Sequence, residues 1–435
     1  MKNIPNGSKR SYALLLAVLL AVTASLLLWS PIFKGEVFAP AKLLYHFEPW
    51  KQSAVVEPIP WNPLLWDGIA QFYVWRDFVW QTERSGYVPL WNPHQFCGAP
   101  MLANSQSAPL YPPHLLLAYF STPIAITLAV LFYLWWAGFG ASLLCWRLGG
   151  GLWPSLLAGI VFQLSTFFVS WLQLPSIPAT ASWYPWIVLA TIGLFESPTW
   201  KRMAALGACI GLMLLAGHLQ FAFYGLLLFG LLSAYLMLVY RMSGKSLRCC
   251  GLLIIGIILG FLLSLPQVLP ALELSRHSHR QVVASEDGYF AYSALAMPLA
   301  NLVTYFVPDF FGHPMDGDYW GWTNYAENAL FVGIIPLLLA LYGLFRRGGS
   351  REKWFFLTLI GIALLMALGT AINRFFYFLV PGFSSTGSPA RVLVLAAFAL
   401  AILSGLGLER MLRDSSEKSL KPLITLAGCM AVLLT

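Results

Sequence analysis

The chain has 435 residues, of which 58% are hydrophobic and only 10% are charged, and its formal net charge is +8. Soluble domains carry about 25% charged residues, so this composition excludes an ordinary soluble protein and predicts a polytopic membrane protein. Membrane topology then explains the excess of basic residues better than nucleic-acid binding does, and we expect a lipid bilayer and no nucleic acid as partner.

Long apolar runs predict an all-α fold of about eleven transmembrane helices, forming a single transmembrane domain over 1–435. The run 115–146 is too long for one straight span, so we expect it to begin with a short interfacial helix. The last run is too short to cross ~30 Å of hydrocarbon, which predicts a chain truncated at its C-terminus. The predicted spans are 11–30, 115–146, 153–172, 179–196, 203–218, 220–240, 250–271, 326–345, 354–371, 390–409 and 422–435.

Basic residues alternate between the two sides of this arrangement. With the N-terminus in the cytoplasm, every short inner loop is basic, as the positive-inside rule requires. Two long segments then lie outside the membrane as the first and second extracytoplasmic loops, 31–114 and 272–325.

The first of these loops contains a predicted amphipathic helix over 67–83, ended by Gly86. Asp67 and Gln71 are four residues apart, so a helix places them on one face. Arg76 is expected to meet phosphates at the level of the lipid headgroups. Two simpler interpretations remain open: the aromatic residues anchor the helix at the interface, and Asp67 is a charge that complements the helix dipole.

Downstream of the helix, Asn-Pro, Gly-Ala-Pro and Pro-Pro steps predict an ordered coil. Its aromatic and amide side chains are typical of a sugar-binding surface, where rings stack on sugar faces and amides bind hydroxyls. The same composition also describes a loop packed against the membrane domain. The candidate sugar-binding residues are Trp91, Asn92, Asn104 and Gln106.

Elsewhere on the predicted outer side, cationic side chains could bind a phosphate and acidic side chains could hold a metal ion. Arg391 opens a predicted span at headgroup depth, where the alternative is a snorkelling helix-end arginine. A cluster of oxygen ligands with a histidine in the second loop could hold Mg²⁺ or Mn²⁺, although a solvated Asp- and Gly-rich turn is the preferred interpretation. The further phosphate candidates are Arg276 and Arg280, and the candidate metal ligands are Asp309, His313, Asp316 and Asp318.

Three motifs of the first loop, DGIAQFYVWRDF, PLWNPHQFCGAP and LANSQSAPLYPPHLL, resemble the first extracytoplasmic loop of bacterial YfhO-type membrane proteins. The late segment SPARVLVLAAFALAILSGLGLERM is also similar to that family. The family is related to the C-type (GT-C) membrane glycosyltransferases. The resemblance implies a polyprenyl-phosphate sugar donor, a cell-envelope acceptor and the bacterial inner membrane, with an acid of the first outer loop as catalytic base. Asp67 is the matching acid; C-type enzymes often have two neighbouring acids, whereas here Asp77 follows ten residues later.

Three functions of different classes therefore stand. The first is an outward-facing glycosyltransferase in which Asp67 is the base and Gln71 lies beside it in the substrate site. The second is a transporter or flippase for a lipid-linked sugar, which predicts ionisable residues at mid-membrane and internal repeats. The third is a non-catalytic membrane protein of envelope assembly. No phosphate-binding loop or nucleotide-binding fingerprint appears in the sequence.

Overall fold

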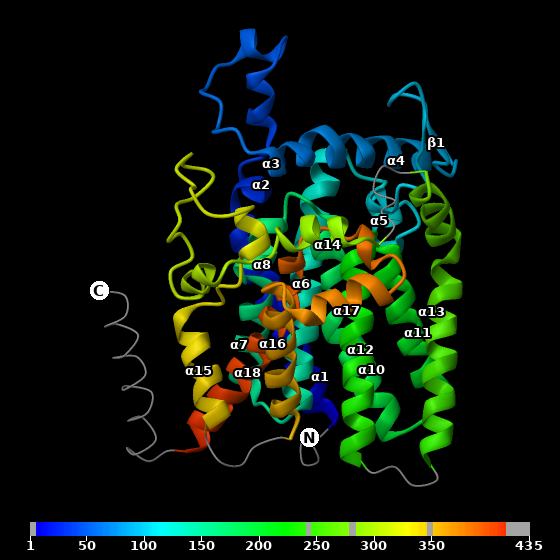
Figure 1. Cartoon of the computed structure of the whole chain (residues 1–435), viewed down its shortest axis with the longest axis vertical. Coiled ribbons are helices and arrows are strands. Elements are labelled where there is room, and N and C mark those ends of the chain that lie inside the picture. The colour runs from blue at the N-terminus through cyan, green and yellow to red at the C-terminus, as the bar shows by residue number, and fades with distance from the viewer. Residues whose placement is uncertain (1–5, 241–244, 278–283, 346–350, 415–435) are drawn as a thin grey trace.

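The computed structural model describes residues 6–240, 245–277, 284–345 and 351–414. Long helices stand side by side in a bundle, and the segments between α2 and α5 and between α13 and α15 gather at one end of it (Figure 1). We call this end of the bundle the loop end. The α-helices are α1 (Asn6–Leu27), α2 (Trp29–Phe33), α3 (Pro63–Asp67), α4 (Val74–Arg84), α5 (Pro112–Leu117), α6 (Thr122–Arg147), α7 (Leu152–Gln163), α8 (Thr166–Trp171), α9 (Ser176–Ala181), α10 (Tyr184–Glu196), α11 (Trp200–Leu215), α12 (Leu219–Tyr240), α13 (Lys245–Ser275), α14 (Glu286–Ser293), α15 (Ile334–Phe345), α16 (Glu352–Ala367), α17 (Ala371–Leu379) and α18 (Leu393–Arg413).

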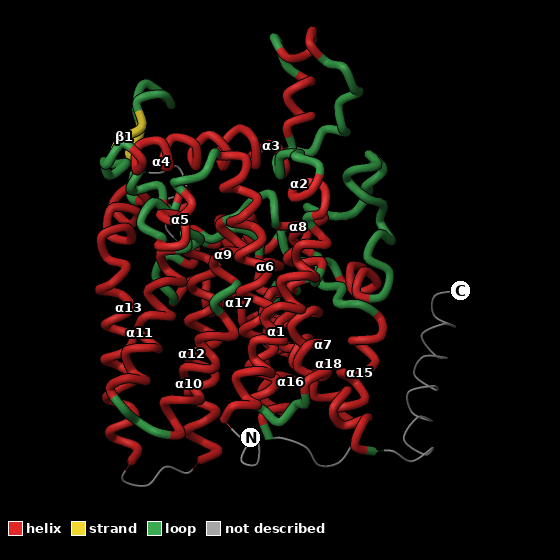
Figure 2. The backbone as a smooth tube through the Cα atoms, turned by 180° about the vertical axis from the view of Figure 1, so that it is seen from behind, coloured by secondary structure: helices red, strands yellow, loops and turns green. Residues whose placement is uncertain are grey.

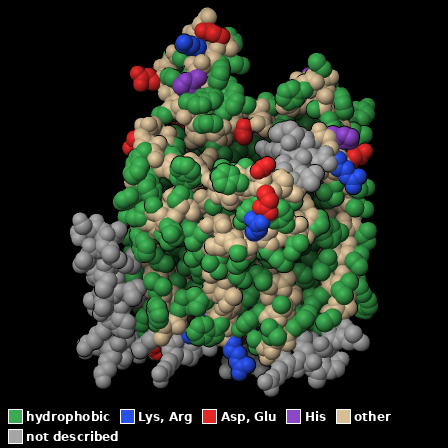
Figure 3. All heavy atoms as spheres, in the orientation of Figure 1, with side chains coloured by type: hydrophobic (Ala, Val, Ile, Leu, Met, Phe, Trp, Pro, Cys, Tyr) green, Lys and Arg blue, Asp and Glu red, His purple; other side chains and the backbone are tan. Residues whose placement is uncertain are grey.

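Seven helical segments of the described chain are long and apolar enough to cross a membrane, and an eighth span results if the bent pair α16–α17, which turns by 79°, counts as one. The protein is thus an all-α, multi-pass membrane protein, as its composition predicts. Figure 3 agrees with this: on the face shown, a broad hydrophobic band separates the charged side chains of the upper part from those at the lower rim. The seven segments are Arg10–Leu27, Thr122–Arg147, Leu152–Trp171, Ser176–Glu196, Leu219–Val239, Arg248–Ser275 and Pro389–Arg413.

These seven segments correspond to seven of the eleven predicted spans, and the bent pair corresponds to 354–371. The predicted span 203–218 is α11, a helix of 16 residues. The predicted start of span 326–345 differs from the structure, because its first residues form a 3-10 turn, Tyr325–Asn328, and α15 begins only at Ile334. The backbone between them turns at Gly333 (φ +96°) and bonds to α8 through Phe331 O and Thr166 N (3.0 Å). The predicted span 422–435 lies outside the described residues.

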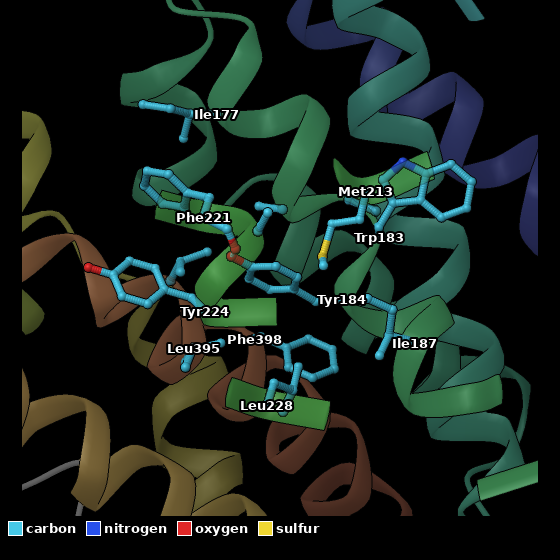
Figure 4. Close-up of a cluster of buried hydrophobic side chains, with 14 of the residues drawn as sticks. Ile177, Trp183, Tyr184, Ile187, Met213, Phe221, Tyr224, Leu228, Leu395 and Phe398 are labelled. Atoms are coloured by element: carbon cyan, nitrogen blue, oxygen red, sulfur yellow. Dashed lines mark hydrogen bonds between the residues drawn. The ribbon is translucent and has the colours of Figure 1, made fainter. Parts of the chain in front are cut away.

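The core of the bundle is formed where α18 packs against α6, α7, α15 and α16. Its crossing with α15 is unusually close, because a Cβ atom at Gly407 would lie 1.9 Å from Leu339 O. A second part of the core joins α9, α10, α11, α12 and α18, with Tyr184, Phe221 and Phe398 among its buried rings (Figure 4). Small residues that let helix backbones approach closely are common where helices cross in membranes.

A helical rod lies across the loop end, formed by α3, a π-helical segment Gly68–Tyr73, and α4 (Figures 1 and 2). It begins where Asn62 caps the helix, with its side-chain oxygen accepting from Leu64 N (3.0 Å), and Pro63 occupies the first helical turn. It ends at Arg84, and Gly86 turns the chain away with a φ of +80°. A helix over 67–83 that Gly86 terminates is therefore confirmed.

Two further features complete the loop end. Residues 34–62, which we call the finger, project beyond the rod as a separate protrusion (Figures 1 and 2). A short hairpin follows the rod, in which β1 (Trp91–Asn92) pairs with β2 (Ala99–Pro100) in antiparallel register. The run 115–146 contains a break, since α5 ends at Leu117 and α6 begins at Thr122, so the expected short leading helix is present.

Candidate functional site

Asp67 lies at the junction of α3 and the π-helical segment, at the loop end of the bundle. Its carboxylate is half-buried and accepts a hydrogen bond from Gln71 Nε2 at 2.7 Å, so the predicted common face of these two residues is confirmed. Gly68 follows and lies against the chain beneath it, where a Cβ atom would come within 3.1 Å of Gln173 O. The acid is therefore oriented by an amide and held on a well-packed part of the rod.

A second Asp-Gln pair with the same spacing lies farther along the rod. Asp77 accepts from Gln81 Nε2 through Oδ2 (2.7 Å) and from the Thr122 hydroxyl through Oδ1 (2.5 Å). This acid fastens α4 to the start of α6. Asp77 is chemically matched to Asp67 but has a structural bond to the bundle, which makes it a suitable comparison in experiments.

Arg391 is the centre of a polar cluster at the loop end of α18. Its Nε and Nη2 both donate to Glu327 Oε1, at 3.0 and 2.7 Å, and the two side chains are only 21% and 11% exposed. Its Nη1 donates to Gln220 Oε1 at 3.3 Å, and its guanidinium lies over the Trp171 ring, 5.4 Å from the centroid. A snorkelling arginine would extend toward solvent, whereas this one is held by an ion pair and a cation–π contact.

The segment 171–173 connects the Asp67 region to the Arg391 cluster. Trp171 lies under Arg391, and its indole Nε1 donates to Ala326 O at 3.0 Å, next to Glu327. Two residues later, Gln173 O lies against Gly68. The structure thus brings the first loop, the 3-10 turn with Glu327 and the start of α18 to the same part of the loop end.

Arg76 lies in the rod but turns inward, with 2% of its surface exposed. Its Nη1 donates to Ser107 O (2.6 Å) and to His114 Nδ1, and His114 Nε2 contacts the Tyr133 hydroxyl. Burial lowers the pKa of Arg76, and burial together with the charge of Arg76 lowers the pKa of His114, whose Nδ1 also lies 3.1 Å from Ala108 O. This position does not suit contact with a lipid phosphate; Arg76 instead joins the rod to the coil and the bundle.

Glu83 lies seven residues beyond Arg76 in α4, about two helical turns along the rod. Both of its carboxylate oxygens are buried and have no hydrogen-bond partner among the described residues, as is also true of Arg76 Nη2. Burial raises the pKa of Glu83 to about 7, although the charge of Arg76 opposes this rise. The charges of Arg76 and Glu83 therefore interact in the interior under the rod.

The predicted sugar-binding residues of the coil occupy different environments. Trp91 is 56% exposed on the hairpin, whereas Asn92 is buried and accepts from His94 N (3.0 Å) within the turn. Asn104 is half-buried at the start of a 3-10 turn. Gln106 accepts from the Ser176 hydroxyl at 3.3 Å, which fixes the coil on α9. Much of the coil is therefore packed against the bundle, as the alternative interpretation holds, and Trp91 alone of the four is strongly exposed.

The acidic cluster of the second loop uses its polar atoms within the loop. Asp318 Oδ1 accepts from His313 N (2.7 Å), His313 Nδ1 accepts from Met315 N (3.2 Å), and Asp309 Oδ1 accepts from the Tyr325 hydroxyl (2.8 Å). Asp316 is exposed. In the part of the chain that the structure describes, no three His, Cys, Asp or Glu side chains are grouped to hold a metal ion, so magnesium or manganese binding here receives no geometrical support.

Two cationic candidates remain. Arg276 is exposed just beyond the end of α13, and Arg280 lies outside the described residues.

Sequence reasoning missed the pairing of Arg391 with Glu327, the contacts of Trp171 and the second Asp-Gln pair. The i, i+4 repeat of Asp and Gln in the rod was a readable signal, but the other contacts join residues 64 or more positions apart.

Fold and site together define a multi-pass α-helical membrane protein with an acid-bearing helical rod and an arginine–glutamate cluster at one end of its bundle. No model of a known protein family matches the chain, and no curated protein matches it.

Proposed function

We propose that this protein is a membrane glycosyltransferase that moves a sugar from a polyprenyl-phosphate donor to a cell-envelope acceptor. In this proposal the loop end faces the outside of the bacterial inner membrane and the N-terminus lies in the cytoplasm. The bundle has a GT-C-like arrangement of about eleven spans, and the rod lies at the outer membrane interface. The observation that carries the proposal is the half-buried Asp67 carboxylate, oriented by Gln71 on a rod that crosses the end of the bundle.

The chemistry needs a base and a means of stabilising a leaving phosphate. The acceptor hydroxyl loses its proton to Asp67 as its oxygen attacks C1 of the sugar, and the C1–O bond to phosphate breaks with both electrons going to the phosphate. The polyprenyl phosphate thereby leaves with one additional negative charge, which nearby cations stabilise. The products are the glycosylated acceptor, polyprenyl phosphate and a proton.

Arg391 is the proposed cation for this phosphate, because residues 171–173 connect it to the Asp67 region. Arg276 lies just beyond α13, toward the other end of the rod (Figures 1 and 2), and is not assigned to this phosphate. Arg391 is partly exposed and already binds the Glu327 carboxylate with two hydrogen bonds. A phosphate oxygen offers the same kind of acceptor as a carboxylate, so the donor competes with Glu327 for the guanidinium. The buried Arg76 acts at a distance from the substrate, by fixing the rod.

The test uses the full chain in liposomes with radiolabelled polyprenyl-phosphate glucose, mannose and N-acetylglucosamine, and a cell-envelope extract as acceptor. We expect label to enter the envelope polymer with release of polyprenyl phosphate. Asp67→Asn should lower the rate by at least about a hundredfold, since a general base contributes roughly 10²–10⁴. The matched variant Asp77→Asn should keep most of the activity.

Equal activity of Asp67→Asn and the wild type would remove Asp67 as the base. Movement of the labelled lipid across the bilayer without transfer would replace the proposal by a transporter. No transfer from any of the three donors, with the protein folded, would favour a non-catalytic role.

A further inference from the structure

The finger carries a cluster of aromatic rings beside the rod. Trp61 is its centre: the ring centroids of Phe47, Trp66 and His46 lie 5.6, 5.6 and 5.8 Å from that of Trp61. Phe47 and Trp66 are 4.7 Å apart and tilted by 35°. Such ring-to-ring distances are those of mutually supporting aromatic pairs, so the cluster is a pre-formed surface whose rings need little ordering on binding.

The cluster is accessible. Trp61 is 46% exposed and Phe47 is 40% exposed, and Trp50 on the same finger is 45% exposed. The two halves of the finger are joined by a contact between His46 Nε2 and Ile59 O (2.8 Å), and its Leu43 side chain is fully buried. Exposed apolar groups that are held rigidly and rimmed by polar residues mark interaction surfaces.

Exposed polar and charged residues share the finger with these rings, which favours a water-facing surface over a membrane anchor. Glu48, Lys51, Gln52 and Glu57 are all exposed on the finger. The finger projects beyond the rod, away from the hydrophobic band of the bundle, and charged and histidine side chains mark its upper part (Figures 1 and 3). An interfacial anchor would instead present its rings at the level of the band with its charges behind them.

The cluster is continuous with the proposed catalytic acid. Trp66, one of its rings, directly precedes Asp67 in α3. The second loop adjoins the finger as well, since a Cβ atom at Gly317 would lie 3.4 Å from Pro60 Cβ. That loop adds the exposed rings of Phe310, Trp320 and Trp322, which are 50%, 68% and 60% exposed.

We propose that the aromatic cluster formed by Phe47 and Trp61 of the finger and Trp66 of the rod binds a glycan strand and delivers it to Asp67. Sugar rings have apolar faces that stack on aromatic rings. Their hydroxyls can donate hydrogen bonds to the Glu48 carboxylate, accept them from Lys51, and do either with the Gln52 amide. This inference rests on the proposed function and deepens it, because it makes the acceptor a polysaccharide rather than a lipid or a protein.

The experiment measures glycan binding separately from catalysis, on the full chain with Asp67→Asn in nanodiscs. The probes are cellohexaose, chitohexaose and mannohexaose, titrated by calorimetry. We expect at least one to bind with a Kd below about 1 mM. Trp61→Ala should weaken that binding at least tenfold, and Trp61→Tyr, which keeps a stacking ring, should restore it to within about threefold.

Trp200→Ala is the matched control, because Trp200 is 61% exposed at the start of α11 and lies outside the finger. It should leave the Kd unchanged. Restoration by Trp61→Tyr excludes misfolding as the cause of the loss. Failure of all three probes to bind with a Kd below about 1 mM, or equal binding by Trp61→Ala and the wild type, would overturn the inference.

A second measurement distinguishes a glycan from the bilayer. The fluorescence of Trp61 is obtained by subtracting the tryptophan emission of Trp61→Phe from that of the wild type, in nanodiscs with and without brominated phospholipid, which quenches tryptophan inside the bilayer. Trp61 emission that brominated lipid does not quench supports the proposal. Quenched emission places Trp61 in the bilayer and overturns it. If the glycan probes bind but the wild-type protein transfers no sugar, the glycosyltransferase proposal is refuted and the glycan-binding site is retained. Transfer activity that survives Trp61→Ala, with no glycan binding, refutes the finger site alone.

Discussion

Replacing Glu327 tests how much the Arg391 cluster stabilises the bundle. The ion pair receives two hydrogen bonds on one oxygen and is mostly buried. Removing one partner of a fully buried pair costs about 3–5 kcal/mol, since the remaining charge is left uncompensated. Here Arg391 keeps Gln220 and the Trp171 ring and is 21% exposed, so we expect Glu327→Ala to cost about 2–4 kcal/mol. Glu327→Gln keeps an acceptor oxygen and should cost about half as much.

The assay is equilibrium unfolding of the purified protein in detergent micelles, followed by far-UV circular dichroism for all variants. A double-mutant cycle with Arg391→Ala isolates the pair, and a coupling of about 1–3 kcal/mol is expected for groups in one network. Stability of Glu327→Ala within about 0.5 kcal/mol of the wild type, or no difference between the Ala and Gln variants, would refute the stabilising role derived from these contacts.

Two further predictions concern the rod and the core. The pKa of Glu83 is raised to about 7 in the folded state, so its contribution to stability is present at low pH and is lost as pH rises from the ordinary carboxyl pKa through about 7. Glu83→Gln should therefore flatten the decrease of the unfolding free energy measured from about pH 5 to 8. An unchanged pH profile would contradict the assignment. Gly407→Ala should destabilise the protein by about 1–3 kcal/mol or more, since its Cβ meets Leu339 O at 1.9 Å. Gly361→Ala on α16 meets nothing within 4 Å and serves as the control; equal unfolding midpoints for the two alanine variants would count against the close crossing.

The sequence was sufficient for the helical class and for the rod. A run of apolar residues bounded by basic loops identifies a membrane helix because the bilayer imposes both length and composition. The rod was predictable because Asp67 and Gln71 share a helical face and Gly86 supplies a backbone conformation that ends a helix.

Pairings between distant segments were beyond the sequence. Apolar content predicts burial but not helix, so the residues before Ile334 read as part of a span although they form a turn that carries Glu327. Arg76 read as a surface cation because it lies on an amphipathic helix, yet its partners, Ser107 and His114, come from the coil and α5 beneath it. Long-range contacts decide whether such a residue faces solvent or the interior, and a single sequence does not contain them.

The way the rod is fastened has a mechanical consequence. Three consecutive residues of α4 are bonded to other segments: Trp75 to Gln95 of the hairpin (2.9 Å), Arg76 to Ser107 (2.6 Å), and Asp77 to Thr122 (2.5 Å). Toward its N-terminus the rod passes through the π-helical segment, and helices bend most readily at such irregularities. Gly68, at the start of this segment, is packed against Gln173 O, so the rod is held on both sides of residues 69–73. Any bend of the rod is therefore confined to that stretch, where it shifts Gln71 and leaves Asp67 in place.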